Sequence, residues 1–344
     1  MHEMHDVLTA FKTELGVESP LWIDYQCTGR QNSMISGFNI AGSNNPKSTG
    51  SQPFYVDNGV VKCGWNQDAF RDYLSMIKTW YEEGLIWEDF AMDANVGISI
   101  STSTSLPDVL AGKIGVVFLE YQDVANFPQN AEAGQEKMTW TAIQNPSLTG
   151  EVNHMTGGLG TATASWAISS QCEDPALACK YINFFYTELG FELANYGIEN
   201  KSWEWVDGKR QFTDFILNNP DGITVDLASC IFMCDTTPYL SDATEKRKLL
   251  YDAVCVDAID AWTEYQDGSM AYPSNTSMTS EETDVYGNTF AEIGTYVSEA
   301  LPKFIFGELN LESDFDAFVA QVNDMGIDTC LAAKQAAYDR YMKR

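Results

Sequence analysis

The three histidines of this 344-residue chain form no recognised catalytic or metal-binding pattern. His2 and His5 are separated by two residues, so the second histidine comes one residue too early for H-E-x-x-H, the spacing that puts two zinc ligands on one helical face. His154 stands alone, which gives little support to a Ser–His or Cys–His nucleophilic system. A G-x-S-x-G nucleophile elbow is also absent from the sequence. The histidines therefore predict neither a hydrolase triad nor a zinc site.

Glycines and carboxylates likewise give no cofactor motif. The segment Gly157-Gly158-Leu159-Gly160 matches neither the dinucleotide-binding nor the P-loop pattern, and no EF-hand loop occurs. The 49 Asp and Glu residues make chance pairs unavoidable. A glycosidase acid and base are recognised by their separation in space, so an aromatic-lined carbohydrate hydrolase remains an alternative. We expect no cofactor and no metal.

The chain has eight cysteines, none in a C-x-x-C pair. In a chain of this length they do not predict a disulfide scaffold, and without histidine partners they do not predict a zinc site. We interpret them as small buried apolar residues. They are Cys27, Cys63, Cys172, Cys179, Cys230, Cys234, Cys255 and Cys330.

Aromatic residues are the unusual feature of the sequence, with nine Trp and sixteen Tyr. A sugar ring presents an apolar C–H face that stacks on an aromatic ring, and its hydroxyls need a few well-placed polar groups. Several aromatics fall in expected loops or at strand ends, and Trp65, Trp203 and Trp262 are ligand-binding candidates on this ground. The alternative is that most of these rings are core residues.

The elements that must position these side chains are short strands alternating with long helices. Apolar spacing predicts helices at about 7–15, 67–83, 175–193, 281–301, 313–325 and 328–343, and strands at 21–23, 114–118, 138–143 and 165–168. Asp57-Asn58-Gly59 and Asp207-Gly208 predict hairpins. Thr279 with Glu282 fits a capping box. The pattern predicts an α/β protein that is rich in helices toward its end.

Composition limits the partners. With 20 Lys+Arg and 49 Asp+Glu the net charge is −29, which disfavours nucleic acid and anionic membrane surfaces. No apolar run is long enough to span a membrane, and the first residues do not form a signal peptide. At roughly 150 residues per domain, the chain predicts about two lobes.

Four blocks of the sequence, in order, are similar to the motifs of one protein family. They are residues 80–91, WYEEGLIWEDFA, which match YKEGLIDPDFA; residues 110–118, which match a GKvGm strand; residues 165–199, which match waIss…nyGiEG; and the end of the chain at 289–344. Asn200 departs from the glycine usual at its position. With these blocks the chain resembles family 1 extracellular solute-binding proteins, the carbohydrate receptors of ABC importers, and specifically Firmicutes lipoproteins.

The resemblance implies a periplasmic-binding-protein-like fold of type II, with two lobes and a hinge. It assigns residues 1–168 and 246–344 to the C-terminal lobe and residues 169–245 to an N-terminal lobe that is incomplete here. Relatives carry a signal, a lipid-attachment cysteine and a long stretch before the segment that resembles residues 1–15. We therefore expect that this chain lacks an N-terminal part and that the full-length parent is lipid-anchored outside the cell.

The resemblance also implies ligand-contacting positions. An aromatic follows the GK.G strand in maltodextrin-type relatives, which indicates Tyr121. The loop after the strand at 21–23 indicates Tyr25, Gln26 and Arg30. The loop at 157–166 indicates Gly158 and Trp166.

These inferences predict a binding protein and not an enzyme. We expect a monomer that captures an oligosaccharide or similar small polar ligand and delivers it to ABC permease subunits in the membrane, with no nucleic-acid partner. The carbohydrate hydrolase and a purely structural module are the alternatives.

Overall fold

The computed structural model describes residues 1–24, 33–42, 53–92, 106–119, 124, 140–148, 150, 152–155, 166–233, 239–251, 253–273 and 276–343. The chain divides into two compact units, each described by itself below. Unit 1 comprises Met1–Gly158 and Ala261–Arg344, and unit 2 comprises Leu159–Asp260. Unit 1 is discontinuous in sequence, with residues 159–260 between its two parts, whereas the expected middle segment is 169–245. The identity of the two lobes stays a prediction.

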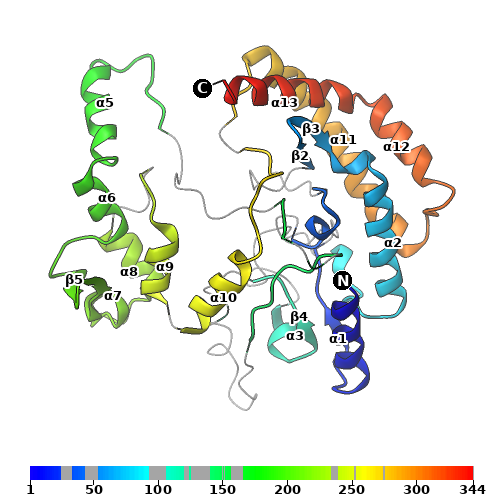
Figure 1. The fold of residues 1–344 in the computed structure, drawn as a ribbon, viewed down its shortest axis with the longest axis horizontal. Helices are drawn as coiled ribbons and strands as arrows, with labels where there is room; N and C mark the ends of the chain where they lie inside the picture. The colour runs from blue at the N-terminus through cyan, green and yellow to red at the C-terminus, as the bar shows by residue number, and fades with distance from the viewer. Residues whose placement is uncertain are drawn as a thin grey trace. The chain divides into compact units, whose positions relative to one another are not determined.

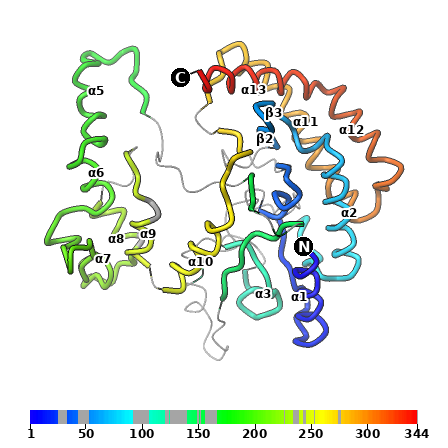
Figure 2. The backbone as a smooth tube through the Cα atoms, viewed as in Figure 1, coloured from blue at the N-terminus to red at the C-terminus, as the bar shows by residue number. Residues whose placement is uncertain are grey.

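Unit 1 is built on helices whose apolar faces meet. Its helices are α1 (His2–Thr13), α2 (Asp68–Glu82), α3 (Leu106–Leu110), α11 (Ser280–Phe306), α12 (Phe315–Asp324) and α13 (Ile327–Tyr341), with short 3₁₀ turns η2 (Ile35–Phe38), η3 (Gly64–Asn66) and η4 (Phe90–Met92). The face of α2 that carries Phe70, Leu74 and Ile77 is buried, as its three-to-four spacing predicts. Although far apart in sequence, α2 and α11 lie side by side (Figures 1 and 2).

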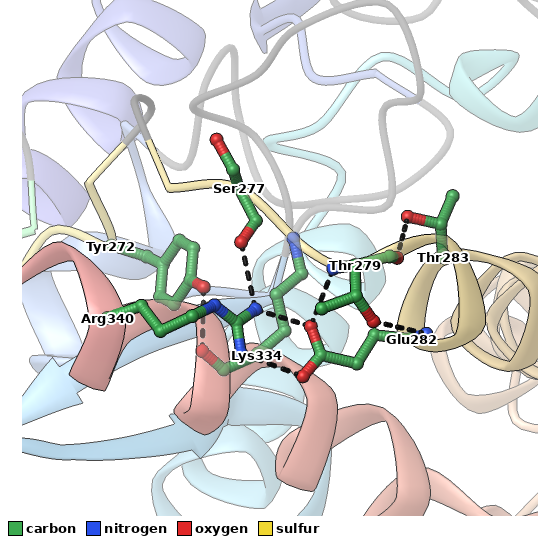
Figure 3. A network of polar contacts seen from close by, with 7 residues as sticks. All are labelled: Tyr272, Ser277, Thr279, Glu282, Thr283, Lys334 and Arg340. Atoms are coloured by element: carbon green, nitrogen blue, oxygen red, sulfur yellow. Dashed lines mark hydrogen bonds and ion pairs between the residues drawn. The ribbon is translucent and has the colours of Figure 1, made fainter.

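Helix α11 begins with the predicted capping box (Figure 3). The Thr279 hydroxyl oxygen accepts the Glu282 N–H at 3.2 Å, and the Glu282 carboxylate accepts the Thr279 N–H at 2.8 Å. The same carboxylate accepts a hydrogen bond from the Arg340 guanidinium of α13, at 2.9 Å from Nη1. The cap therefore also joins the two helices. The helix ends at Phe306, and the next residue, Gly307, has a φ of 77°, which favours glycine.

The strands are short and form three two-stranded sheets among the described residues. In unit 1, β1 (Ser19–Leu21) pairs in parallel with β4 (Ile114–Val116), and β2 (Phe54–Asp57) forms a hairpin with β3 (Val60–Cys63). Unit 2 contains the hairpin β5 (Trp203–Val206) and β6 (Lys209–Phe212). Both predicted hairpins are confirmed, and their turns carry positive φ values at Asn58, Gly59, Asp207 and Gly208.

Two predicted strands are wrong where the structure describes them. Residues 140–143 and 166–168 belong to no strand and form no bridge. Their apolar side chains gave the expectation, but a strand also needs a neighbouring strand for its backbone hydrogen bonds.

The core of unit 1 is rich in aromatic rings. Trp65 and Phe290 stack with centroids 5.6 Å apart, and Phe290 also contacts Phe54 and Tyr286. The thiols of Cys63 and Cys330 are buried in the same cluster. The interpretation of the cysteines as buried residues is confirmed for these two and for Cys255, but it is wrong for Cys179 and Cys230, which lie on exposed helix positions, and Cys172 is only half-buried.

Unit 2 consists of α5 (Pro175–Phe184), α6 (Glu188–Asn195), the β5–β6 hairpin, α7 (Asp214–Leu217), α8 (Val225–Phe232) and α9 (Ala243–Leu250). Its boundary with unit 1 falls within α10 (Ala253–Thr263). Tyr196, Trp203 and Phe212 form the centre of its core. The single helix predicted at 175–193 is broken, because the Thr187 hydroxyl accepts the Gly190 N–H at 3.2 Å and starts a new helix.

None of the described helices has the length and apolar composition needed to cross a membrane.

Candidate functional site

An open depression lies within unit 1, where residues 144–153 meet the end of α10. We call it the amide pocket, because most of its described polar lining consists of Asn and Gln. Its cavity volume is only about 10 Å³, far below the roughly 300–1,000 Å³ of a drug-sized ligand site, so it is a shallow contact surface for part of one sugar and does not enclose an oligosaccharide. The lining residues are Gln144, Asn145, Asn153, Ala261, Trp262, Tyr265 and Gln266.

Backbone hydrogen bonds fix the two segments that form the pocket. Asn153 and Gln266 form a parallel β-bridge. The Asn153 N–H donates to the Tyr265 carbonyl at 2.7 Å, and the Asp267 N–H donates to the Asn153 carbonyl at 3.1 Å. Trp262 is in the last turn of α10, so the bridge holds its ring and that of Tyr265 on the same side of unit 1 as the amides.

The lining residues have two roles. Asn153 is buried, and its side-chain amide donates to the Ser36 hydroxyl at 2.7 Å while its carbonyl oxygen accepts the Met155 N–H at 2.9 Å. It therefore holds the floor of the pocket. Gln144 and Tyr265 are exposed, whereas Asn145, Trp262 and Gln266 are half-buried. Amides that both donate and accept hydrogen bonds, next to two aromatic rings, suit a neutral ligand with hydroxyls and an apolar face.

A histidine, a carboxylate and a hydroxyl meet beside the pocket, but they do not form a catalytic relay. The carboxylate oxygens of Asp267 lie 3.0 Å from His154 Nδ1, and Ser269 Oγ lies 3.2 Å from the same nitrogen. A Ser–His–Asp triad places the carboxylate and the hydroxyl on opposite ring nitrogens. The pKa of Asp267 is lowered, first by the Ser269 N–H and then by His154, so this carboxylate is ionised at neutral pH.

The structure places the sequence-predicted aromatic residues in different surroundings. Trp262 lines the amide pocket. Trp166 belongs to unit 2, where it stacks on Phe185 at 5.7 Å and contacts Tyr181 edge-on at 5.9 Å.

Trp65 and Trp203 are core residues. Trp65 is 0% exposed and its indole N–H donates to the Gly42 carbonyl at 2.6 Å, while Trp203 is 2% exposed. Neither ring presents a face on which a sugar could stack.

Five predicted contacts lie outside the described residues and stay predictions: Tyr25, Gln26, Arg30, Tyr121 and Gly158. The sequence reasoning missed Gln144, Asn145, Tyr265 and Gln266. The dipeptide Asn145-Pro146 is a turn signal that could have drawn attention to the first two.

The described residues contain no group of three or more His, Cys, Asp or Glu side chains suited to a metal ion.

Comparison with known proteins identifies the fold. No family model matches the sequence, and no curated protein matches it. Solved structures do match. An extracellular solute-binding protein from Bifidobacterium longum subsp. infantis superposes with a TM-score of 0.68 at 18% identity, covering 99% of this chain and 69% of that one.

Two further solved structures give the same result. The HMO-binding, ABC-transporter-associated solute-binding protein of Bifidobacterium longum infantis has a TM-score of 0.67 at 19% identity, with 99% of this chain and 69% of that chain covered. The alginate-binding protein AlgQ2 without calcium ion has a TM-score of 0.64 at 21% identity, with 98% and 68% covered. The chain therefore has the helix-rich α/β fold of periplasmic solute-binding proteins, as predicted. These structural neighbours are binding proteins and not enzymes.

Proposed function

We propose that this chain is the substrate-binding component of an ABC importer, which captures an oligosaccharide or related sugar outside the cell and delivers it to the permease. The observation that carries the proposal is the amide pocket, in which Trp262 and Tyr265 stand beside Gln144, Asn145 and Gln266. Stacking on the rings and hydrogen bonding to the amides retain a sugar without breaking a bond.

The fold supports this proposal independently of the pocket. Two neighbours with this fold are named as binding HMO and alginate. A third, the FusA substrate-binding protein of S. pneumoniae, was solved in complex with kestose. It superposes on this chain with a TM-score of 0.61 at 19% identity, covering 99% of this chain and 68% of that one. We extend sugar binding and cooperation with an ABC permease from these proteins to this chain. Lipid anchoring to the cell surface, Firmicutes-type family membership and a monomeric state are part of the same proposal.

A thermal-shift screen of the full chain against mono- and oligosaccharides tests the proposal. A ligand at 100 times its Kd stabilises the folded state by about 2.7 kcal/mol, which raises Tm by several degrees. A reproducible rise with at least one sugar, dependent on its concentration, is the expected result. No rise across the panel at millimolar sugar would contradict the proposal and favour a purely structural module, whereas release of shorter sugars would favour the hydrolase.

A further inference from the structure

We propose that the amide pocket selects neutral sugars and rejects uronates, the sugars that carry a carboxylate at C6. This inference rests on the proposed function and specifies its ligand class. It starts from the lining: none of the described residues that line the pocket is Lys, Arg, His, Asp or Glu. Burying part of an ionised carboxylate without a cationic partner is costly, whereas a neutral hydroxyl needs only an amide or a similar group.

The available donors suit hydroxyls better than a carboxylate. A site that binds a carboxylate tightly typically presents a bidentate Arg or a Lys. Gln144, Asn145 and Gln266 each offer one side-chain acceptor and one NH₂ group. Their acceptor oxygens match the donor protons of sugar hydroxyls, which a carboxylate lacks. A uronate would therefore leave an acceptor that faces C6 without a donor, and it would meet no cation in the described lining.

The charge next to the pocket also opposes an anion. Asp267 follows the lining residue Gln266, and its lowered pKa keeps it ionised at neutral pH. The Nδ1 atom of the His154 ring beside it is already engaged by that carboxylate and by the Ser269 hydroxyl. The sequence as a whole carries a net charge of −29, which adds long-range repulsion.

Matched pairs of trisaccharides that differ only at C6 isolate the effect of the carboxylate. Suitable pairs are β-1,4-mannotriose with trimannuronate, cellotriose with tri-glucuronate, and α-1,4-galactotriose with tri-galacturonate. The full chain is titrated with each by isothermal calorimetry, after a thermal-shift screen that contains neutral and uronate sugars in equal number. We expect that all hits are neutral, or that the neutral member of a pair binds at least tenfold more tightly.

The salt dependence gives a second readout. Raising the ionic strength from 20 to 300 mM should strengthen any residual uronate binding and leave neutral binding unchanged, because salt screens repulsion between the anion and the protein. Uronate binding that weakens with added salt would indicate a cationic site and would overturn the inference.

A charge-adding variant ties the selectivity to the pocket. Gln144→Lys places a cation at the exposed rim, and Gln211→Lys adds the same charge at an exposed position of β6 in unit 2. We expect Gln144→Lys to raise the ratio of uronate to neutral affinity by up to about fivefold, the upper range for an exposed ion pair, and Gln211→Lys to leave it unchanged. An equal change in both variants would contradict a local origin.

The outcomes separate the two proposals. Hits confined to uronates, or uronates that bind as tightly as their neutral partners, would overturn the inference while leaving sugar binding intact. No hit with any sugar would contradict the proposed function and the inference together.

Discussion

Lys334 of α13 gives the sharpest prediction about stability. Its ammonium lies among three rings, 4.7 Å from the centroid of Tyr286, 5.0 Å from that of Tyr272 and 5.5 Å from that of Phe54. Burial lowers the pKa of Lys334 from its ordinary 10.5 to about 8. Between these two values the unfolded chain binds more protons at this position than the folded chain, so the Lys334 contribution to stability rises with pH.

The size of this effect follows from the two pKa values. A difference of 10.5 − 8 = 2.5 corresponds to about 3.4 kcal/mol of destabilisation while the folded ammonium stays charged. From pH 7 to pH 10, linkage predicts that about 2.5 kcal/mol of this cost is relieved. Attraction of the ammonium to the rings acts in the opposite direction, at about 0.5–2 kcal/mol per contact, and the measurement decides which effect dominates.

The assay is urea unfolding of the wild type and Lys334→Met at pH 7 and pH 10. The thiol of Cys63 and the phenol of Tyr286 have pKa values raised by burial, and both lower stability as the pH increases. The difference between the variant and the wild type removes these shared contributions. We expect the stability of Lys334→Met relative to wild type to fall by about 2.5 kcal/mol from pH 7 to pH 10.

Lys343→Met, an exposed position just after α13, serves as the matched control and should show no such change. A Lys334→Met difference that is the same at both pH values would refute the reasoning. It would mean that the rings stabilise the ammonium enough to cancel its desolvation.

Three further predictions concern folding. Thr279→Ala removes the capping hydroxyl of α11 and should cost about 1 kcal/mol in urea unfolding, and recovery with Thr279→Ser would confirm the role of the hydroxyl. Gly287→Ala should stabilise α11 by about 0.5–1 kcal/mol, because no atom lies near the new Cβ. Gly64→Ala should destabilise the protein, because its Cβ would lie 1.7 Å from the Ala41 carbonyl oxygen. Equal effects of the two substitutions on the free energy of unfolding would contradict the packing. The exposed thiol of Cys179 should react with Ellman's reagent in the folded state. The buried thiol of Cys63, whose pKa is raised to about 12, should react only on unfolding. Rapid reaction of both thiols in the folded state would be inconsistent with the structure.

Long amphipathic elements could be predicted from the sequence because their pattern repeats over several turns. The α2 helix repeats its apolar spacing from Phe70 to Trp80, and α11 adds a capping box at Thr279 to the same kind of pattern. The hairpins could be predicted because Asn58-Gly59 and Asp207-Gly208 supply the positive φ values that the turns require.

Features that depend on distant partners could not be predicted. The apolar pattern runs on from α5 into α6, but the Thr187 side chain bonds to Gly190 and the chain breaks there. Residues 140–143 have a strand-like composition but lack a strand partner.

The candidate site was predicted only in part for the same reason. Trp262 and Trp65 are the same residue type in expected loop positions, yet one lines the amide pocket and the other is fully buried. Exposure depends on which segments fold over a ring, and a single sequence does not report it. Gln144 and Gln266 lie far apart in the chain and line the same pocket, where Gln266 forms a bridge with Asn153.

The most direct test of the account is to measure the affinity of the full chain and of Trp262→Ala for the best sugar found in the thermal-shift screen. Trp205→Ala, which removes a 51% exposed ring in unit 2 outside the pocket, is the control. Loss of stacking at Trp262 should weaken binding by roughly tenfold, equivalent to about 1.4 kcal/mol, with Trp262→Phe largely restoring it and Trp205→Ala having no effect. Unchanged affinity in Trp262→Ala would show that the sugar binds elsewhere and would contradict the account.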